Sequence, residues 1–495
     1  MSLFLEISRT FAAVIYLMAS AGLVFFGLNA YVMLFLYARG GRKNSALQAK
    51  TEADWREATR DQDLPIVTTQ IPLYNEYNVA ARVINAVAAF DYPAEKHQIQ
   101  ILDDSTDETR ELVDGIAATL RENGIWIDVF RREVRHGYKA GALADAMPAA
   151  KGDFIAIFDS DFVPAADFLR RMLPHFADPR TAVAQARWTH LNRDHSLLTR
   201  AQSIGIDGHF VIEQTARSTN GLFLNFNGSA GIWRREAIED AGGWTADTLT
   251  EDLDLSYRAQ LRGWHFEYVP DVQVPAEIPE SHTAFKSQQF RWAKGSLQTA
   301  IKLLPAVFRS HLPLLTKIEA TVHVCHYFAH FLMLLIVLLA YPALGKLHGL
   351  FHPALIAVVI VPFILTALGP PIFYLVSQKI LYPREWLKRI LLMPVLTLIG
   401  FGICISNSRA ILEAFLGIRS GFVRTPKSGE TRVKTYRSHT GLIPFLEILT
   451  GLYAAWATFV FALSENFGIV PFLIIYSVGF LWVGSSSLRE QLRRS

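Results

Sequence analysis

Phe154-Ile155-Ala156-Ile157-Phe158-Asp159-Ser160-Asp161 is the stretch from which the fold of this chain is predicted. Apolar residues lead directly into an Asp-x-Asp pair, a pattern that predicts a buried strand ending at the carboxyl edge of an α/β sheet, where such folds bind ligands. Asp159 and Asp161 cannot both lie near apolar neighbours unless a cation or hydrogen-bond donors neutralise them. A divalent cation, Mg²⁺ or Mn²⁺, that holds a diphosphate satisfies both carboxylates. The alternative is an ordinary turn or helix cap, because Asp-x-Asp pairs occur in many loops.

The composition indicates that part of the chain lies in a membrane. Of its 495 residues, 51% are hydrophobic and 19% are charged, which is more apolar and less charged than a soluble domain. One apolar run covers residues 11–37, and the others follow residue 318. The sequence therefore predicts an N-terminal transmembrane anchor (1–40), a soluble α/β domain (41–305), and an interfacial helix with a C-terminal transmembrane bundle (306–495).

Charge and cysteine content exclude other classes. The net charge of +3 is small for this length, so it does not favour nucleic acid as a partner. Cys325 and Cys404 both lie in apolar stretches and offer neither a disulfide framework nor metal-ligand spacing.

Strands and helices alternate around the opening stretch. Residues 65–72, 99–102 and 125–130 read as strands, and a helical pattern follows each of them. This order predicts βαβ units and a mostly parallel sheet. Asp103 and Asp104 follow the second strand, and Lys139 lies at the mouth of a later helix.

These charges are expected to converge on one edge of the sheet, where they would bind a nucleotide and its phosphates. The alternatives are that Asp103 and Asp104 cap the following helix and that Lys139 is simply solvated.

Two later segments add further candidates. Asp252 lies in the first turn of a predicted helix, where it is a candidate general base for an acceptor hydroxyl. The alternative is that the acids of this turn only stabilise the helix N-terminus.

Gln288, Arg291 and Trp292 fall on one helical face. Arg can clamp a diphosphate and Trp can stack on a sugar, whereas an interfacial Trp-Arg pair at the membrane border is the alternative.

The C-terminal apolar segments predict several membrane spans. They are close to the length that a bilayer requires and lie near 318–341, 354–376, 441–463 and 467–485. Segment 390–416 is ambiguous. If it crossed, a very basic stretch after it would be external, so a re-entrant or interfacial segment is favoured over a sixth span. The basic cluster at 39–43 then places the soluble domain in the cytosol.

Polar residues in the bundle need partners in lipid. They include His323, His326, His330 and Asn407, which are candidates to line a polymer path. A metal site built from the three histidines is the alternative, and a packed or pore-facing stripe is favoured because no carboxylate accompanies them there.

Taken together, these motifs resemble the membrane-bound family 2 glycosyltransferases, which include cellulose, chitin and hyaluronan synthases. The likeness is greatest to the cellulose-synthase-like enzymes that make mannan, glucomannan or the backbone of xyloglucan in plants. The motifs that carry the resemblance are Gln70-Ile71-Pro72, Leu102-Asp103-Asp104, Gly137-Tyr138-Lys139, Asp159-Ser160-Asp161, Gln185-Ala186-Arg187-Trp188, Phe226-Asn227-Gly228, Glu251-Asp252 and Gln288-x-x-Arg291-Trp292.

The resemblance implies a GT-A domain, a transmembrane bundle, and a role for each matched residue. It assigns Asp103 and Asp104 to the nucleoside, Lys139 to the phosphates, Asp159 with Asp161 to metal and diphosphate, Asp252 to the catalytic base, Gln288 and Arg291 to the diphosphate, and Trp292 to the growing chain. The basic stretch 417–440 resembles a gating loop, in which Thr425 and Lys427 would contact phosphate; binding of anionic lipid is the alternative.

Asn227 stands where cellulose synthases carry Cys, which argues against cellulose as the product.

The expected function is processive, inverting transfer from GDP-mannose or UDP-glucose, with Mg²⁺ or Mn²⁺ as cofactor. The product would be a β-linked, and by expectation β-1,4-linked, mannan or glucan that passes through the bundle of a bacterial inner membrane or Golgi-type membrane. The alternatives are a non-processive transferase with a lipid acceptor and a catalytically inactive channel or scaffold.

Overall fold

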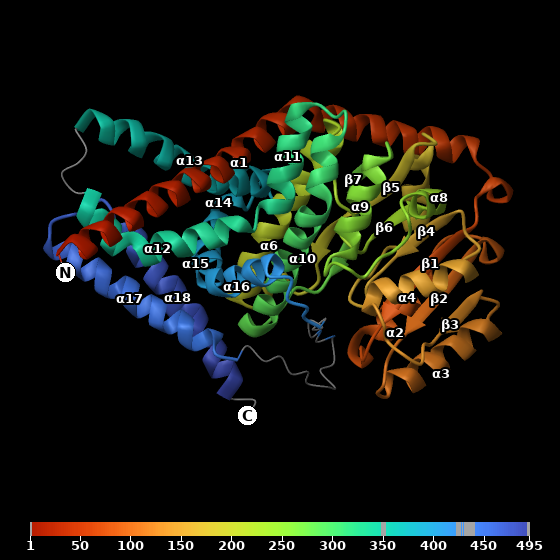
Figure 1. Ribbon diagram of the computed structural model, residues 1–495. Coiled ribbons are helices and arrows are strands. Elements are labelled where there is room, and N and C mark those ends of the chain that lie inside the picture. Colours follow the sequence, from red (N-terminus) through yellow and green to blue (C-terminus); the bar gives the residue numbers. More distant parts are fainter. Residues whose placement is uncertain (1, 348–352, 422–426, 428, 430–440, 493–495) are drawn as a thin grey trace.

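The computed structural model describes residues 2–347, 353–421, 427, 429 and 441–492. Figure 1 shows the strands gathered at one end of the molecule and the C-terminal helices at the other, with helix α1 running along both. The candidate site lies between these two parts. It is therefore framed by a sheet on one side and by helices of the C-terminal half on the other.

Within the described residues, seven strands form one sheet in the order β3-β2-β1-β4-β6-β5-β7. The strands are β1 (Val67–Leu73), β2 (His97–Asp103), β3 (Ile127–Phe130), β4 (Phe154–Ile157), β5 (Thr181–His190), β6 (Gly231–Arg234) and β7 (His265–Ala276). Strands β3, β2, β1 and β4 are parallel, and so are β5 and β7, whereas β6 is antiparallel to both of its neighbours. The predicted mostly parallel sheet is thus confirmed.

The register of the sheet brings the predicted carboxylates to one edge. Val67 of β1 pairs with His97 of β2 and with Phe154 of β4, so the three strands begin in line. Strand β4 ends at Ile157, and the chain continues through Phe158 into the acidic pair beyond it. Every residue of β4 is buried, as expected for a strand covered on both faces.

Helices cover both faces of the sheet and enclose two apolar cores. They include α2 (Tyr77–Ala88), α3 (Thr109–Glu122), α4 (Tyr138–Ala146), α5 (Phe168–Met172), α6 (Leu197–Gly208), α7 (Thr215–Thr219), α8 (Arg235–Asp240) and α9 (Glu251–Leu261), with a π-helical segment at His209–Gln214. Helix α10 (His282–Arg309) then crosses from the sheet to the C-terminal helices (Figure 1).

Helix α1 (Ser2–Ala58) is longer than the predicted anchor, which was expected to end at residue 40. Its extension packs against the α/β domain, where Gln48 donates a 2.8 Å hydrogen bond to the carbonyl of Tyr268 on β7. Glu52 lies 3.3 Å from the guanidinium of Arg171 on α5. These contacts to the α/β domain stabilise the part of α1 that continues beyond residue 40.

The C-terminal half is helical. Its elements are α11 (Leu314–Cys325), α12 (Phe328–Leu347), α13 (Pro353–Leu381), α14 (Trp386–Ile390), α15 (Met393–Gly402), α16 (Cys404–Phe415), α17 (Ile443–Leu463) and α18 (Val470–Leu492). In the part of the chain that the structure describes, three helices are long and apolar enough to cross a membrane, at Glu6–Gly41, Ile443–Leu463 and Val470–Leu492.

Two bent helix pairs raise that number to as many as five if each is one span. The span expected near 318–341 corresponds to one of these pairs, in which α11 and α12 meet at 64°. Segment 386–415 bends by 42° after Gly402, a geometry that fits a broken span or a re-entrant loop. The re-entrant form and the crossing at 354–376 stay predictions.

Candidate functional site

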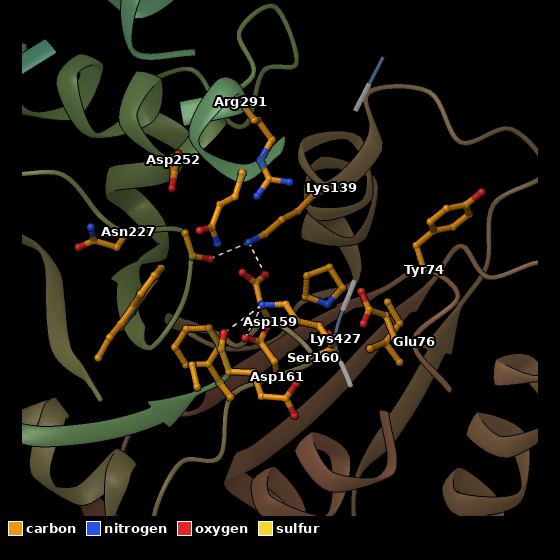
Figure 2. A pocket seen from close by; sticks show the side chains of 18 of the residues that line it. Tyr74, Glu76, Lys139, Asp159, Ser160, Asp161, Asn227, Asp252, Arg291 and Lys427 are labelled. Carbon is orange, nitrogen blue, oxygen red and sulfur yellow. Dashed lines mark hydrogen bonds and ion pairs between the residues drawn. The ribbon is translucent and has the colours of Figure 1, made fainter. Parts of the chain in front are cut away.

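A cavity of about 180 Å³ lies at the carboxyl edge of the sheet and is bordered by α4, α9 and α10 (Figure 2). Most of the predicted site residues line it. They are Asp104, Lys139, Asp159, Asp161, Asp252, Gln288, Arg291, Trp292 and Lys427. The structure thus brings together side chains as far apart in the sequence as Asp104 and Lys427.

Asp159 and Asp161 each contact an ammonium group. Lys139 Nζ lies 2.6 Å from Asp159, and Lys427 Nζ lies 2.6 Å from Asp161. The side chain of Asp161 is only 4% exposed. Burial raises the pKa of Asp161, and Lys427 opposes that rise. A cation at this carboxylate therefore offsets the cost of burying its charge.

The donor set at this edge fits a divalent cation that is shared with a ligand. The carboxylates of Asp159 and Asp161 each bind a lysine ammonium group. Carboxylate oxygens are also ligands that Mg²⁺ and Mn²⁺ prefer. Among the described residues no group of three or more His, Cys, Asp or Glu side chains is arranged to hold a metal by itself. The remaining ligands would therefore come from the bound molecule and water, as is usual for cations held with phosphates.

Lys139 and the loop before β6 define another part of the cavity. Besides its contact with Asp159, Lys139 Nζ donates a 2.8 Å hydrogen bond to the carbonyl of Gly228. Burial disfavours the charge, but the carboxylates of Asp159 and Glu251 outweigh it and hold the pKa of Lys139 above its usual value. Gly228 has φ +81°, and a Cβ there would lie 2.8 Å from an oxygen of Asp252. Glycine is therefore required for this close approach.

Asp252 lies in the first turn of α9 and faces the cavity (Figure 2). Burial raises the pKa of Asp252 to about 7, the nearby carboxylate of Glu251 adds to the rise, and Lys139 opposes it. One carboxylate oxygen accepts a 2.8 Å hydrogen bond from the backbone N–H of Leu253, which fixes its orientation. A carboxylate that takes up a proton near neutral pH is well matched to general base chemistry.

Arg291 enters the cavity from α10 (Figure 2). Burial lowers the pKa of Arg291, while the carboxylates of Glu251, Asp159, Asp252 and Asp161 oppose that change in this order. The guanidinium remains a permanent cation, since its ordinary pKa is far above neutrality. It thus supplies fixed positive charge and several N–H donors next to the acidic pair.

Asp103 is not brought into the cavity. Its side chain is fully buried and lies 2.9 Å from the guanidinium of Arg131, and it also accepts a hydrogen bond from the N–H of Ser105. Among the described residues that line the cavity, Asp103 is absent. Asp103 thus orders the turn after β2, and its contact with the nucleoside stays a prediction. Thr425 lies outside the described residues.

Sequence reasoning missed the arginines that follow β3. Arg132 holds Asp104, with its Nη2 2.5 Å from the carboxylate, and Arg135 lies 3.5 Å above the ring centroid of Tyr74. Arg135 and Tyr74 both line the cavity. The signal was the basic run after a predicted strand, which becomes informative once the strand is placed beside β2.

A second cavity of about 410 Å³ lies behind Asp252 and extends toward the C-terminal helices. Asp252, Gln288 and Trp292 line both cavities, so the two adjoin at these side chains. Aromatic residues form much of the wall of this second cavity. They are Trp188, Phe210, Phe285, Trp292, Tyr327, Phe373 and Tyr374. Aromatic faces combined with polar groups are typical of sugar-binding surfaces.

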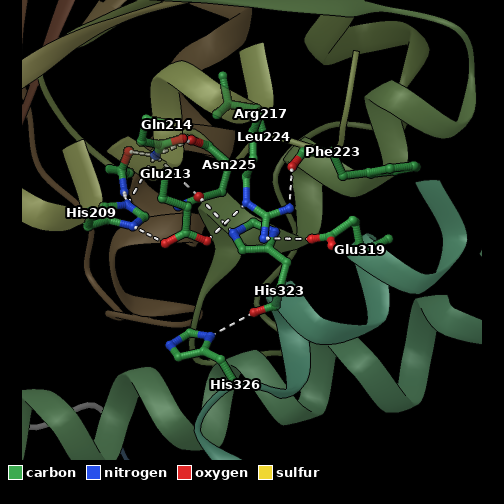
Figure 3. A network of polar contacts seen from close by, with 12 residues as sticks. His209, Glu213, Gln214, Arg217, Phe223, Leu224, Asn225, Glu319, His323 and His326 are labelled. Carbon is green, nitrogen blue, oxygen red and sulfur yellow. Dashed lines mark hydrogen bonds and ion pairs between the residues drawn. The ribbon is translucent and has the colours of Figure 1, made fainter. Parts of the chain in front are cut away.

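The three bundle histidines line this second cavity, whereas the fully buried Asn407 is not among its described lining residues. Figure 3 shows that His323 belongs to a polar network with Glu213 and Arg217. Arg217 Nε donates to Glu213 over 2.9 Å, and His209 Nδ1 lies 2.9 Å from the other carboxylate oxygen. The three histidines therefore form a polar wall of the second cavity, and Glu213 is a carboxylate next to His323 that the sequence did not indicate.

This chain is similar to known glycosyltransferases. Residues 65–295 match the profile of the family described as "Glycosyltransferase like family 2". The chain is 42% identical over 259 residues to glucomannan 4-beta-mannosyltransferase 2 of Arabidopsis thaliana, a match that covers 51% of this chain and 48% of that protein. It is 38% identical over 296 residues to glucomannan 4-beta-mannosyltransferase 1 of Cyamopsis tetragonoloba, covering 59% and 56%. The chain thus spans about half the length of the curated relatives it matches.

Among solved structures, a mannosyltransferase from Pyrobaculum calidifontis in complex with GDP-Man and Mn²⁺ has a similar fold. The TM-score is 0.52 at 19% identity, and the match covers 82% of this chain and 100% of that chain. At this identity the likeness bears on the fold alone. Together with the sequence matches, it confirms the predicted GT-A-type α/β domain with a mostly parallel sheet.

Proposed function

We propose that this protein, whose residues 65–295 match the profile of glycosyltransferase-like family 2, is a membrane-bound inverting hexosyltransferase that builds a β-linked mannan. The observation that carries the proposal is the convergence of Asp161, Asp252 and Arg291 on one cavity. A cation-binding carboxylate, a candidate base and a fixed cation are the groups that transfer from a nucleotide sugar requires.

In the proposed reaction, Asp252 accepts the proton of the acceptor hydroxyl. The hydroxyl oxygen then forms a bond to the anomeric carbon from the face opposite the nucleoside diphosphate, whose bond to that carbon breaks. The anomeric configuration inverts, so an α-linked donor yields a β-linkage. Arg291 and Lys139 stabilise the negative charge that develops on the departing diphosphate, which is usually the largest contribution at such sites.

Asp159 and Asp161 would hold a divalent cation, and that cation would supply Lewis-acid stabilisation of the diphosphate. Lys427 contacts Asp161 and would share or yield this carboxylate when a cation binds. Gln288 would lie beside the diphosphate and Trp292 beside the acceptor sugar, since both line the junction of the two cavities.

GDP-mannose is the proposed donor. The relatives are named as glucomannan 4-beta-mannosyltransferases, and the similar fold was solved with GDP-Man and Mn²⁺. The test is to offer radiolabelled GDP-mannose and UDP-glucose, one at a time, to detergent-purified protein with Mn²⁺ or Mg²⁺. Incorporation from GDP-mannose supports the assignment, and incorporation from UDP-glucose alone would make the product a glucan.

Processive synthesis and export form the finer part of the proposal. The second cavity begins at Asp252 and is lined by residues of α11, α12, α13 and α15, so a chain extended at Asp252 could enter the helical half directly.

A lipid acceptor is the alternative within the enzyme class. The polar and aromatic wall of the second cavity favours a saccharide chain over a lipid tail. An inactive channel or scaffold is disfavoured because the charged groups of the first cavity are all present.

The pH dependence of transfer follows from Asp252. A general base must be deprotonated, and the pKa of Asp252 is raised to about 7. We expect kcat/KM to rise about tenfold per pH unit below pH 7 and to level off above it. Initial rates between pH 5 and pH 9 would measure this. A flat profile through pH 6–8 would contradict the assignment of Asp252 as the base.

A further inference from the structure

Helix α10 connects the α/β domain to the C-terminal helices. Its N-terminal half carries Gln288, Arg291 and Trp292, which line the first cavity. Helices α16, α17 and α18 each contribute a carboxylate to α10, and these residues are Glu413, Glu447 and Glu490. The three contacts differ in geometry, but all of them are made to α10.

The contact from α17 is a fully buried ion pair. Lys286 Nζ lies 2.8 Å and 3.1 Å from the two carboxylate oxygens of Glu447, and the two side chains are 1% and 0% exposed. An isolated charge in this position would be very unfavourable, so each residue requires the other. The pair therefore fixes the distance between α10 and α17 at this level.

In the contact from α16, the lysine that α10 contributes is also buried. Lys294 Nζ lies 2.7 Å from Glu413 and 2.6 Å from the hydroxyl of Ser420, and the lysine side chain is fully buried. Lys286 and Lys294 are eight residues apart, slightly more than two helical turns, so they project from neighbouring positions on α10. Two such pairs limit rotation of the helix about its axis.

The contact from α18 caps the N-terminus of α10. The two carboxylate oxygens of Glu490 accept 2.9 Å hydrogen bonds from the backbone N–H groups of His282 and Thr283, and the Thr283 hydroxyl donates over 2.6 Å. These N–H groups have no partner within the helix, and a negative charge there also interacts favourably with the helix dipole. Glu490 therefore limits sliding of α10 along its axis.

The opposite side of α10 reaches the cavity. Lys286 precedes Gln288 by two residues and Lys294 follows Trp292 by two, which places each pair about 200° apart around the helix. The helix also positions the segment before the base. Gln298 accepts a 2.9 Å hydrogen bond from the N–H of Leu249, and a Cβ at Gly295 would lie 2.8 Å from the backbone nitrogen of Thr250. Displacement of α10 would therefore move Arg291 and the start of α9 together.

We propose that Glu413, Glu447 and Glu490 form a clamp, here called the α10 clamp, which fixes the rotation and axial position of α10 and so sets the geometry of Arg291 and Asp252. These three are positioning residues, since they act through α10 and do not line the first cavity. The inference deepens the proposed glycosyl transfer, because the C-terminal helices then determine whether the leaving group and the base are correctly placed.

The test compares variants of the full chain in detergent. Glu447→Gln breaks the buried pair, and Glu413→Gln is a milder variant, because Ser420 still accepts from Lys294. The reversed pair Lys286→Glu/Glu447→Lys restores the attraction with exchanged partners. Glu239→Gln is the matched control, since Glu239 forms a partly exposed ion pair with Arg235 on α8, and neither residue lines the first cavity.

Hydrogen–deuterium exchange without substrate gives a readout that does not depend on activity. Glu447→Gln and Glu413→Gln are expected to increase exchange at residues 282–295 and 249–255, and Glu239→Gln is not. Steady-state kinetics should show kcat lowered about tenfold or more in Glu447→Gln with KM changed less than about threefold, and the reversed pair should recover most of kcat.

Unchanged exchange in both segments for Glu447→Gln and Glu413→Gln would overturn the proposal. So would a reversed pair that unfolds at the wild-type temperature yet remains as slow as Glu447→Gln. If wild-type protein transfers no sugar from any nucleotide donor, the proposed function fails, while the exchange measurement still decides whether the α10 clamp holds the helix.

Discussion

Asp252→Asn is expected to lower the rate of sugar transfer by about 10²–10⁴-fold, because an amide cannot accept the proton of the acceptor hydroxyl. The side chain keeps its size, and it can still accept the hydrogen bond from the N–H of Leu253 that orients Asp252. Affinity for the nucleoside diphosphate should therefore stay within about threefold of wild type, since in the proposed reaction Asp252 acts on the acceptor and not on the leaving group. Transfer rates and calorimetric titration with GDP measure the two quantities separately.

Glu251→Gln provides the matched control for this variant. Glu251 is the neighbouring acid on α9, and its charge contributes to the raised pKa of Asp252. Its removal should lower that pKa and shift the acid limb of the pH profile to lower pH, with transfer at pH 8 largely retained. Turnover at the wild-type rate in Asp252→Asn would refute the role of Asp252 as the base.

Asp161→Asn is expected to reduce kcat/KM by about 10²-fold or more and to weaken the dependence of GDP binding on Mn²⁺. The amide removes a negative charge from a site that is only 4% exposed and that already holds the ammonium of Lys427. Titration of GDP binding at increasing Mn²⁺ concentration would measure the effect. Ser160→Ala, between the two carboxylates, is the control and should bind the cation normally. If Asp161→Asn keeps the wild-type response to Mn²⁺, this carboxylate does not hold the cation.

Much of the sheet could be predicted because periodicity and strand-end chemistry are local properties. Residues 65–72 and 99–102 were recognised as strands and appear as β1 and β2 with their ends shifted by one or two residues. The acidic pair after β4 was placed at the sheet edge for the same reason, since a buried run must end where its polar residues begin.

The direction of the Asp103 side chain could not be predicted from the motif. Successive side chains along a strand point to opposite faces of the sheet, so Asp103 and Asp104 are expected to point in different directions. Asp104 lines the cavity, whereas Asp103 pairs with Arg131 on the other side. Motif similarity assigned both residues to the nucleoside, and only the pleat of the strand separates them.

The contacts of α10 could not be predicted from the sequence. Lys286 and Glu447 are separated by 161 residues, and Lys294 and Glu413 by 119. A glutamate in an apolar helix indicates that some partner exists, but local pattern cannot identify it. The 64° bend between α11 and α12 was missed for a similar reason, because the apolar run continues through it and gives no local signal of a break.

The central claim is that one cavity, formed by Asp161, Asp252 and Arg291, transfers a sugar to a chain that enters the adjoining cavity. The most direct measurement is to incubate the purified full-length protein with radiolabelled GDP-mannose and Mn²⁺, and then to determine the size and linkage of the product. The account predicts a long polymer that β-mannanase degrades and that is absent with Asp252→Asn. A labelled lipid conjugate, or a product that persists with Asp252→Asn, would contradict it.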